Sequence, residues 1–426
     1  MTEDILKESV KDELSTVGPV EIIVGIPSYN NAQTIGHVVQ AAQAGLLSYF
    51  PDRKALIINS DGGSKDGTPE VVKQASIDAH SLMLVSHPLY PVHRLTTPYH
   101  GLPGKGSAFR TLFRIAEVTQ ARALVVVDAD LRSITPEWFN LLLQPVLALG
   151  FDYVAPYYKR HKYDGTITNS IVYPLTRALY GRRIRQPIGG EFGISGRLAG
   201  HFLTRDVWNT DVARYGIDIW MTTTAIAENF RVCQSYLGAK IHDPKDPGSD
   251  LSVMLVQVVG SVFSLMETYD SVWRNVLGSL PAPLLGFPFE VGLEAVPINV
   301  QRTLASFQQG VRDLLPVYER VLTSQQVREL ELCAVQGVDK FVLADELWVT
   351  IICSFALAYH RRVFDREHLV KSLTPLYLGW VTSFARQTEN ETSAQVDGRI
   401  EKLCLVYEQL KPYVINQWPL KTGEKR

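Results

Sequence analysis

Two carboxylates separated by one residue follow an apolar run in the segment VVVDAD, which ends at Asp130. The run 123–127 predicts a buried strand, whose end would place Asp128 and Asp130 at the carboxyl edge of a sheet. Mg²⁺ takes oxygen ligands, commonly one or two carboxylates together with substrate phosphates. The pair could therefore hold a metal–diphosphate group. D-x-D alone is more often a pair of solvated loop carboxylates or a helix cap, but its position after an apolar strand favours the metal–diphosphate role.

Two glycine-rich segments offer further polar groups, NSDGGSKDGT at 59–68 and GLPGKG at 101–106. Asp61 follows an expected strand and is placed to accept hydrogen bonds from a ribose or a base, and the glycines beside it permit positive φ. Lys105 lies near an expected helix N-terminus and could meet a phosphate. The second segment lacks the spacing of a Walker phosphate loop, and either segment alone is also typical of an ordinary turn.

The elements that must position these residues alternate in the first half of the chain. Strands are expected at 21–27, 54–59, 81–85, 123–127 and 152–156. Helices are expected at 34–47, from Pro69 onward, and at 107–119. Alternating strands and helices with nearly continuous apolar strands predict an α/β fold with a mostly parallel sheet covered on both faces. Ligands bind beyond the carboxyl ends of such strands, where the polar residues cluster in this sequence.

The pattern changes after about residue 250, where strand signals nearly vanish. Helices are expected at 252–277, 300–322, 324–335, 345–360, 366–386 and 394–413, and the proline-rich segment 280–297 is expected to be an ordered loop. We therefore expect an N-terminal tail (1–18), an α/β domain (19–250) and an all-helical C-terminal domain (251–426). Exposed apolar faces on the C-terminal helices favour a homodimer.

Composition excludes several classes of protein. The 42 Lys and Arg residues against 44 Asp and Glu residues leave a net charge of −2, without the basic surplus that holds a nucleic-acid backbone. The 4 cysteines are widely spaced with no CxxC pair, so we expect no zinc site or disulfide framework, and a reducing cytoplasm. The apolar runs fall short of the roughly 20 residues that cross a bilayer. We therefore expect neither a nucleic-acid partner nor a membrane.

The motifs in combination resemble the family-2-type GT-A nucleotide-sugar glycosyltransferases. The resemblance covers about 22–132 and comprises the strand end IPSYN, DGGSKDGT, GLPGKG and DAD. It implies a Rossmann-like GT-A domain that binds a nucleotide-diphosphate sugar. The donor-binding positions that it implies are Pro27, Ser28, Asn31, Asp61, Lys105, Asp128, Ala129, Gly189 and Gly190.

Three later segments resemble the retaining glucosyl-3-phosphoglycerate synthases and their relatives that use glycerate: QPIGGEF (186–192), RYGIDI (214–219) and LGAKIH (237–242). This resemblance implies transfer of glucose from UDP-, GDP- or ADP-glucose to the 2-hydroxyl of D-glycerate or 3-phosphoglycerate, which makes a glucosylglycerate-type compatible solute. It implies that Asp130 and His242 bind Mg²⁺ or Mn²⁺, and that Glu191 and Asp218 line the sugar pocket as catalytic residues. His242 follows a strand-like stretch, although a lone histidine is more often structural than a ligand.

The acceptor site departs from the phosphoglycerate-using pattern. The resemblance places acceptor contacts at Gly165, Thr166 and Thr168, and Thr166 stands where an arginine would hold the acceptor phosphate. Loss of the guanidinium removes a planar phosphate fork, which favours unphosphorylated glycerate. The basic residues of 159–162 (KRHK) could replace the lost charge.

Other functions remain open at the level of the sequence. Within the same fold they are a mannosylglycerate-type synthase and an inverting GT-A transferase of polysaccharide or cell-envelope synthesis. A sugar nucleotidyltransferase, which also uses carboxylates and glycine-rich loops, belongs to another class. Retention of anomeric configuration follows only from the resemblance.

Overall fold

The structure is a computed structural model that describes residues 5–75, 92–98, 104–242, 251–289 and 291–418. The chain forms two compact units. The first comprises Met1–Arg160, Ile184–Asp243 and Ala282–Leu293, and the second comprises His161–Arg183, Pro244–Pro281 and Glu294–Arg426. The expected domain boundary near residue 250 stays a prediction, but the compact units interleave along the chain, and 161–183 joins the helical unit.

The first unit is built on an eight-stranded sheet with the order β10-β8-β5-β7-β4-β1-β2-β3. Its strands are β1 (Ile22–Ser28), β2 (Ala55–Asp61), β3 (His93–Pro98), β4 (Ala123–Val126), β5 (Tyr153–Lys159), β7 (Phe192–Ser195), β8 (Val232–Ala239) and β10 (Leu284–Leu285). Strand β7 runs antiparallel to β4 and β5, and the other strand pairs of this sheet are parallel. The expected mostly parallel α/β sheet is therefore confirmed.

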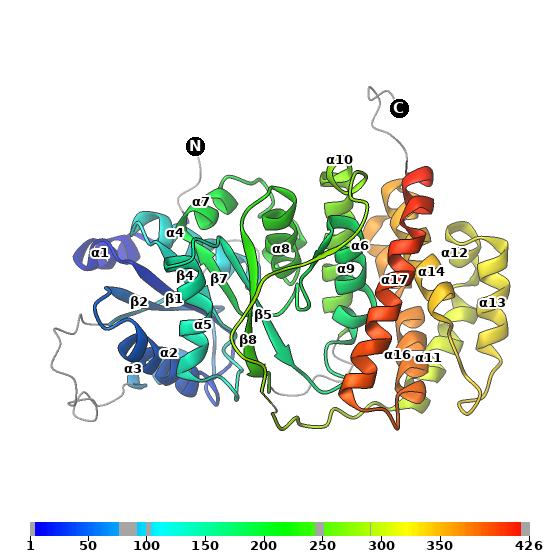
Figure 1. Cartoon of the computed structure of the whole chain (residues 1–426), viewed down its shortest axis with the longest axis horizontal. Helices are drawn as coiled ribbons and strands as arrows, with labels where there is room; N and C mark the ends of the chain where they lie inside the picture. Colours follow the sequence, from blue (N-terminus) through cyan, green and yellow to red (C-terminus); the bar gives the residue numbers. More distant parts are fainter. Residues whose placement is uncertain (1–4, 76–91, 99–103, 243–250, 290, 419–426) are drawn as a thin grey trace. The chain divides into compact units, whose positions relative to one another are not determined.

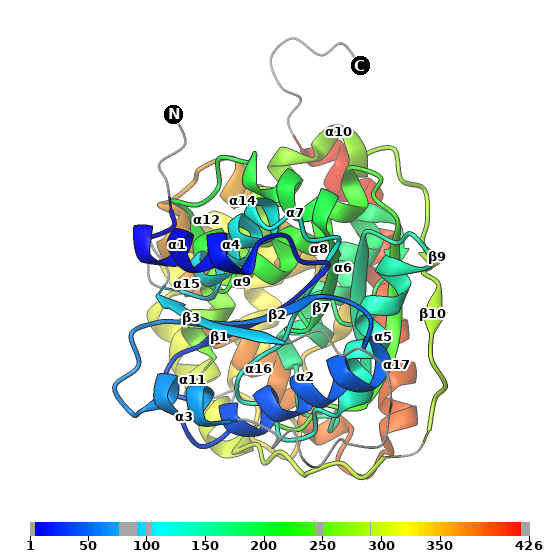
Figure 2. The ribbon, with the colours of Figure 1, turned by 90° about the vertical axis from the view of Figure 1, so that its left-hand side faces the viewer.

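Helices cover both faces of this sheet (Figures 1 and 2). On one face lie α2 (Ile35–Tyr49), α3 (Thr68–Gln74) and α5 (Pro136–Leu147), and on the other α4 (Lys105–Val118), α7 (Gly196–Leu203) and α8 (Ile217–Ala227). Alternate residues of β1, such as Val24 and Ile26, are buried in one apolar core with residues of α2 and α5. Burial on both faces explains why the central strands read as continuous apolar runs.

The expected strands near β1, β2, β4 and β5 are present, each within a few residues of its predicted bounds. The strand expected at 81–85 lies outside the described residues. The expectations missed β3 and β7, because each is short and polar or glycine-containing, with no apolar run to signal it. They also missed the two-residue strand β10, which lies in the segment 280–297 that was expected to be a loop. The expected N-terminal tail contains a helix, α1 (Glu8–Val17), which buries Val10 and Leu14.

The second unit is helical, as expected. A π-helical turn (Thr168–Val172) leads into α6 (Tyr173–Tyr180), and β6 (Arg182–Arg183) pairs with β9 (Leu280–Pro281). The other helices are α9 (Ser252–Thr268), α10 (Asp270–Trp273), α11 (Val300–Asp313), α12 (Leu315–Val321), α13 (Ser324–Ala334), α14 (Asp345–His360), α15 (Arg366–Ser372), α16 (Thr374–Gln387) and α17 (Ser393–Gln417).

Three long helices of the expected set are divided. The segment 252–277 forms α9 and α10, and the other two divisions have a common cause. The segment 300–322 forms α11 and α12, and 366–386 forms α15 and α16. A proline lies in the first turn of the second helix in both cases, Pro316 and Pro375. Proline lacks the N–H that a continuous helix needs and is tolerated in a first turn, so each helix restarts at that point.

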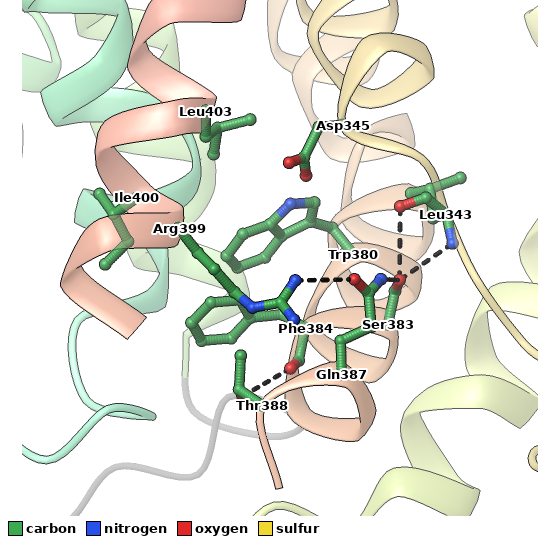
Figure 3. Close-up of a pocket in the computed structure, with 10 residues that line it drawn as sticks. All are labelled: Leu343, Asp345, Trp380, Ser383, Phe384, Gln387, Thr388, Arg399, Ile400 and Leu403. Atoms are coloured by element: carbon green, nitrogen blue, oxygen red, sulfur yellow. Dashed lines mark hydrogen bonds between the residues drawn. The ribbon is translucent and has the colours of Figure 1, made fainter. Parts of the chain in front are cut away.

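No helix of the described residues is both long enough and apolar enough to cross a lipid bilayer. The second unit contains a small cavity of about 30 Å³ between α14, α16 and α17 (Figure 3). Trp380 and Phe384 form its aromatic wall, with their ring centroids 4.7 Å apart. Three of its polar side chains pair with one another: Arg399 contacts Gln387 at 3.3 Å, and Gln387 contacts Ser383 at 2.8 Å. A cavity of this size holds about two water molecules, which is too little for a sugar.

Candidate active site

Five charged side chains gather at the carboxyl edge of the sheet of the first unit, and we call them the charged cluster. They are Lys105, Asp128, Glu191, Asp218 and Lys240. Asp128 follows β4 and Lys240 follows β8, which places both at the ends of parallel strands. Glu191 directly precedes the antiparallel β7, whose Phe192 pairs with Val126 of β4, so the chain enters β7 where β4 ends.

Lys105 links two motifs that lie far apart in the sequence. Its ammonium nitrogen lies 2.8 Å from Oδ1 of Asp128 and 3.3 Å from Oδ2 of Asp218. A backbone hydrogen bond joins the start of α4 to the segment before α8, because the Gly106 N–H donates to the carbonyl oxygen of Arg214 at 3.2 Å. A Cβ atom on Gly106 would lie 1.8 Å from the carbonyl oxygen of Val212, so only glycine permits this approach.

Lys240 lies on the other side of Asp128. Its ammonium group donates to Oδ2 of Asp128 at 2.9 Å, to Oε1 of Glu191 at 2.7 Å and to the Gly189 carbonyl oxygen at 2.8 Å. Asp128 thus contacts both ammonium groups, whereas Glu191 contacts only Lys240 and Asp218 contacts only Lys105 among the described residues.

The cluster holds three carboxyl groups against two ammonium groups. Glu191, Asp218 and Lys240 are buried, whereas Lys105 and Asp128 are partly exposed. Complete burial raises the pKa of Glu191 to about 8, and burial also raises the pKa of Asp218. Burial opposes the charge of Asp128 as well, but the ammonium groups of Lys105 and Lys240 hold its pKa well below the usual range. The excess carboxyl group therefore favours retention of one proton, on Glu191 or Asp218.

One oxygen of each of these two carboxyl groups is buried and has no hydrogen-bond partner among the described residues, Oε2 of Glu191 and Oδ1 of Asp218. Buried polar atoms are normally hydrogen-bonded, so such atoms at a strand edge are available to a ligand. Both residues are among those expected to line a sugar pocket, and their catalytic role stays a prediction.

The predicted donor-binding segments lie side by side. The Asn31 N–H donates to Oγ1 of Thr68 at 2.9 Å, which joins the end of β1 to the glycine-rich loop after β2. The hydroxyl of Thr34 donates to the carbonyl oxygen of Ala129 at 2.8 Å, which joins the same region to D-x-D. Pro27 and Ser28 belong to β1 itself, between β2 and β4.

Asp61 organises the glycine-rich loop. Its Oδ2 accepts from the Gly63 and Ser64 N–H groups at 2.8 and 2.9 Å. Its Oδ1 accepts from the Ser64 hydroxyl at 2.6 Å and from the Ser28 hydroxyl at 3.3 Å. A carboxylate has about four lone-pair sites, so the loop itself uses most of the accepting capacity of Asp61. The expected contact with a ribose or base would add to these bonds or displace one.

The two expected metal ligands come from neighbouring segments. The Arg132 N–H donates to the carbonyl oxygen of Ile241 at 2.9 Å, and the Arg132 guanidinium donates to the carbonyl oxygen of His242 at 3.4 Å. These bonds place the residues after Asp130 beside those before His242. Within the described residues, no three His, Cys, Asp or Glu side chains gather into a metal site. A cation at this point would take protein ligands from Asp130 and His242 and its remaining ligands from a diphosphate or water.

The expected acceptor residues belong to the second unit. Thr166 is 0% exposed, and its hydroxyl lies 2.5 Å from the hydroxyl of Tyr377. Gly165 has a φ of 71°, and Thr168 begins the π-helical turn and is also buried. The acceptor role of these residues stays a prediction. The structure shows that the Thr166 side chain already has a partner within its own unit.

Lys162, one of the basic residues that could replace the missing arginine, is already hydrogen-bonded to the protein backbone. Lys162 donates to the carbonyl oxygens of Thr388, Glu389 and Glu391 at 2.6, 2.8 and 3.0 Å. An ammonium group has three N–H donors, so Lys162 has none left for a phosphate. Arg160 donates to the Tyr158 hydroxyl at 2.8 Å, in the first unit.

Lys240 and Tyr158 were not predicted from the sequence as site residues. The hydroxyl of Tyr158 donates to the Gly189 carbonyl oxygen, which also accepts from Lys240. A lysine two residues before a predicted metal ligand and an aromatic residue near a strand end are weak signals by themselves. Their importance follows from strand order, which brings β5, β8 and the turn before β7 together.

Comparison with known proteins gives no match among curated proteins. Among solved structures, glucosyl-3-phosphoglycerate synthase from Mycobacterium tuberculosis, in complex with Mn²⁺, UDP-glucose and phosphoglyceric acid, is 21% identical. This similarity covers 58% of this chain and 80% of that chain with a TM-score of 0.43. The same enzyme in complex with Mg²⁺ and UDP is 21% identical over 60% of this chain and 82% of that chain, also with a TM-score of 0.43. Residues 92–264 match the family model of the glycosyltransferase domain of mannosylglycerate synthase, which confirms the resemblance to glycosyltransferases over the segment that contains the charged cluster.

Proposed function

We propose that the chain is a metal-dependent glycosyltransferase that moves a hexose from a nucleotide-diphosphate sugar to the 2-hydroxyl of D-glycerate. The observation that carries the proposal is the charged cluster, in which two ammonium groups and three carboxyl groups meet at the carboxyl edge of a Rossmann-like sheet. The match to a mannosylglycerate synthase domain over 92–264 supports a sugar donor and a glycerate acceptor.

The donor would bind across the loops after β1, β2 and β4, which hydrogen bonds join to one another. Lys105 contacts two carboxylates, and its ammonium nitrogen lies 5.5 Å from the ring centroid of Phe109. Its positive charge and partial exposure suit a donor phosphate. Gly189 and Gly190 would border the sugar, beside Glu191.

The residues present fit a divalent cation, because a carboxylate and an imidazole come from adjacent segments and leave coordination positions for phosphate oxygens. Asp130 and His242 would hold Mg²⁺ or Mn²⁺. Bound there, the cation would offset negative charge that develops on the departing diphosphate.

In the proposed reaction a bond forms between the glycerate 2-oxygen and the anomeric carbon, and the bond between that carbon and the diphosphate oxygen breaks. The proton of the hydroxyl passes to the departing phosphate oxygen on the same face of the sugar, which retains the anomeric configuration. The free oxygens of Glu191 and Asp218 would hold sugar hydroxyls by hydrogen bonds. Much of the barrier reduction would come from holding acceptor and donor in contact.

Two donor sugars are candidates. The motifs of the sequence resemble glucosyl transferases, which would make this chain a glucosylglycerate synthase or a glucosyl-3-phosphoglycerate synthase. The family match over 92–264 favours mannose and a mannosylglycerate-type product. Glucosylglycerate-type and mannosylglycerate-type products are both compatible solutes and are made by the same class of reaction.

The test is a matrix of UDP-, GDP- and ADP-glucose and GDP-mannose against D-glycerate and 3-phosphoglycerate, with Mg²⁺ or Mn²⁺ and NMR identification of products. We expect one α-linked hexosylglycerate product above the others. Absence of transfer in every combination, or release of pyrophosphate from a nucleoside triphosphate and a sugar phosphate, would contradict the proposal. The second outcome would identify a sugar nucleotidyltransferase.

A further inference from the structure

Lys240 uses all of its hydrogen-bonding capacity on the protein. An ammonium group has three N–H donors, and those of Lys240 meet Asp128, Gly189 and Glu191 at 2.9, 2.8 and 2.7 Å. Its side chain is 4% exposed. No N–H therefore remains for a substrate atom.

The three acceptors belong to two segments that the proposed function assigns to the sugar donor. Asp128 is the first carboxylate of D-x-D, and Gly189 and Glu191 belong to the G-G-E turn before β7. Gly190, between them, has a φ of 98°, and a Cβ atom on it would lie 2.2 Å from Oδ2 of Asp128 and 3.0 Å from Nζ of Lys240. The turn thus lies directly against both side chains, at a distance that only glycine permits.

Without the ammonium group of Lys240, Oε1 of Glu191 and the Gly189 carbonyl oxygen would lose the donor that joins them to Asp128, and Lys105 would remain beside Asp128. A buried acceptor left without its donor costs free energy, so the turn would no longer be held against Asp128 from β8. A separate bond supports the same turn, because the Tyr158 hydroxyl also donates to the Gly189 carbonyl oxygen. The turn is therefore held from β8 by Lys240 and from β5 by Tyr158.

We infer that Lys240 is a positioning residue that fixes the G-G-E turn and Glu191 against the first carboxylate of D-x-D, without touching the substrate. The inference deepens the proposed function and rests on it for the kinetic readout only. It separates the two lysines of the cluster: Lys105 acts on the donor, and Lys240 acts through Glu191 and Asp128.

The test compares Lys240→Met, Lys240→Arg and Lys105→Met with the control Lys73→Met, an exposed lysine of α3 outside the donor-binding loops. For Lys240→Met we expect kcat to fall roughly tenfold to a hundredfold, as for other residues that orient a catalytic group, with nucleotide affinity by calorimetry changed much less. Lys105→Met should show the reverse emphasis, with the larger loss in nucleotide affinity. Lys240→Arg restores the charge, but its planar head cannot reproduce a three-way ammonium contact, so we expect incomplete rescue.

Tyr158→Phe is the milder variant should the Lys240 variants fold poorly, because it removes one bond to the turn and keeps the ring. We expect a smaller loss of kcat in the same direction. Crystal structures supply a readout that does not need activity: in Lys240→Met, residues 189–191 should shift relative to Asp128. An unshifted turn, full kcat in Lys240→Met, or a loss of nucleotide affinity equal to that of Lys105→Met would overturn the inference. A wild-type protein without transfer activity but with a shifted turn in the variant would contradict the proposed function alone.

Discussion

The ammonium nitrogen of Lys105 lies 2.8 Å from Oδ1 of Asp128, which joins the G-K-G loop to the D-x-D motif. The sequence alone predicts two separate binding sites from these motifs, one for a phosphate and one for a metal–diphosphate group. In the folded chain they form one cluster, so a change in the charge of Lys105 alters the electrostatic environment of Asp128, and the reverse.

Lys105→Met should weaken the binding of nucleoside diphosphates about tenfold to a hundredfold, since the loss of one charge-assisted hydrogen bond costs roughly 1.5–3 kcal/mol. Calorimetric titration of UDP and GDP measures the change, with Lys73→Met of α3 as the control for loss of an exposed lysine charge. Asp61→Ala should lower both nucleotide affinity and the melting temperature, because its carboxylate accepts three hydrogen bonds from the loop and one from Ser28 of β1. Unchanged affinity in both variants would mean that the loops have only a structural role.

Asp130→Ala and His242→Ala should each remove most of the turnover and leave the melting temperature nearly unchanged, because both residues are partly exposed at the strand edge rather than in the core. EDTA should have the same effect on the wild-type protein, and added Mg²⁺ or Mn²⁺ should reverse it. Activity assays paired with thermal melting provide the measurement. Full activity after either substitution, or in EDTA, would exclude the metal assignment.

The stability of the protein should fall as pH rises from about 5 to about 8, through the contribution of Glu191. Burial raises its pKa to about 8 in the folded chain, whereas an unfolded glutamate releases its proton near its ordinary value of 4.5. Between these two values the folded state holds the extra proton, so the stabilisation present at low pH is lost as pH increases.

The measurement is thermal melting at several pH values for the wild type and Glu191→Gln. Glutamine mimics the neutral acid, so the variant should become more stable relative to the wild type as pH rises across this window. Melting curves that stay parallel at every pH would show that Glu191 is ionised throughout.

Gly106→Ala should lower the melting temperature and the activity, because its Cβ would lie 1.8 Å from the backbone oxygen of Val212 and force α4 away from the segment before Asp218. The matched control is Gly200→Ala in α7, where a Cβ would meet no atom within 4 Å. Alanine is the better helix former by about 1 kcal/mol, so the control should be slightly stabilised. Equal effects of the two substitutions would contradict the close approach.

Glycerate should be used more efficiently than 3-phosphoglycerate when the two acids compete at equal concentration. Thr166 has no guanidinium, and the ammonium group of Lys162 is fully used by three carbonyl oxygens. A preference of about tenfold or more for the phosphorylated acid, roughly 1.4 kcal/mol, would contradict this expectation.

Thr166→Arg is a test of stability rather than of specificity. Its site is 0% exposed and its hydroxyl contacts Tyr377, so a guanidinium would be buried without a partner. We expect a large drop in melting temperature, whereas Thr166→Val, which keeps the shape, should cost about 1–3 kcal/mol for the lost hydrogen bond. Comparable melting of all three proteins would show that the position is open to solvent.

The sequence by itself determined the main strands and the motifs at their ends. Buried parallel strands such as β1, β2 and β4 are short apolar runs bounded by turns, and that signal is local. Polar residues that follow such runs must lie at the carboxyl edge of the sheet, so Asp61, Asp128 and their neighbours could be placed there without coordinates. The divisions of the long helices at Pro316 and Pro375 were also present in the sequence, although the helical periodicity hid them.

Only the tertiary structure decided which of these residues meet. The four-residue strand β7 enters the sheet antiparallel between β4 and β5, and this insertion carries Glu191 to Asp128. Lys240 reaches both from the end of β8, and Lys105 reaches Asp218 because Gly106 packs against the backbone at Val212. Strand order and close backbone approach depend on contacts between segments far apart in the chain. The free energies of these contacts come from packing and from the neutralisation of buried charges by one another. A local sequence pattern cannot predict them, because it describes only neighbouring residues.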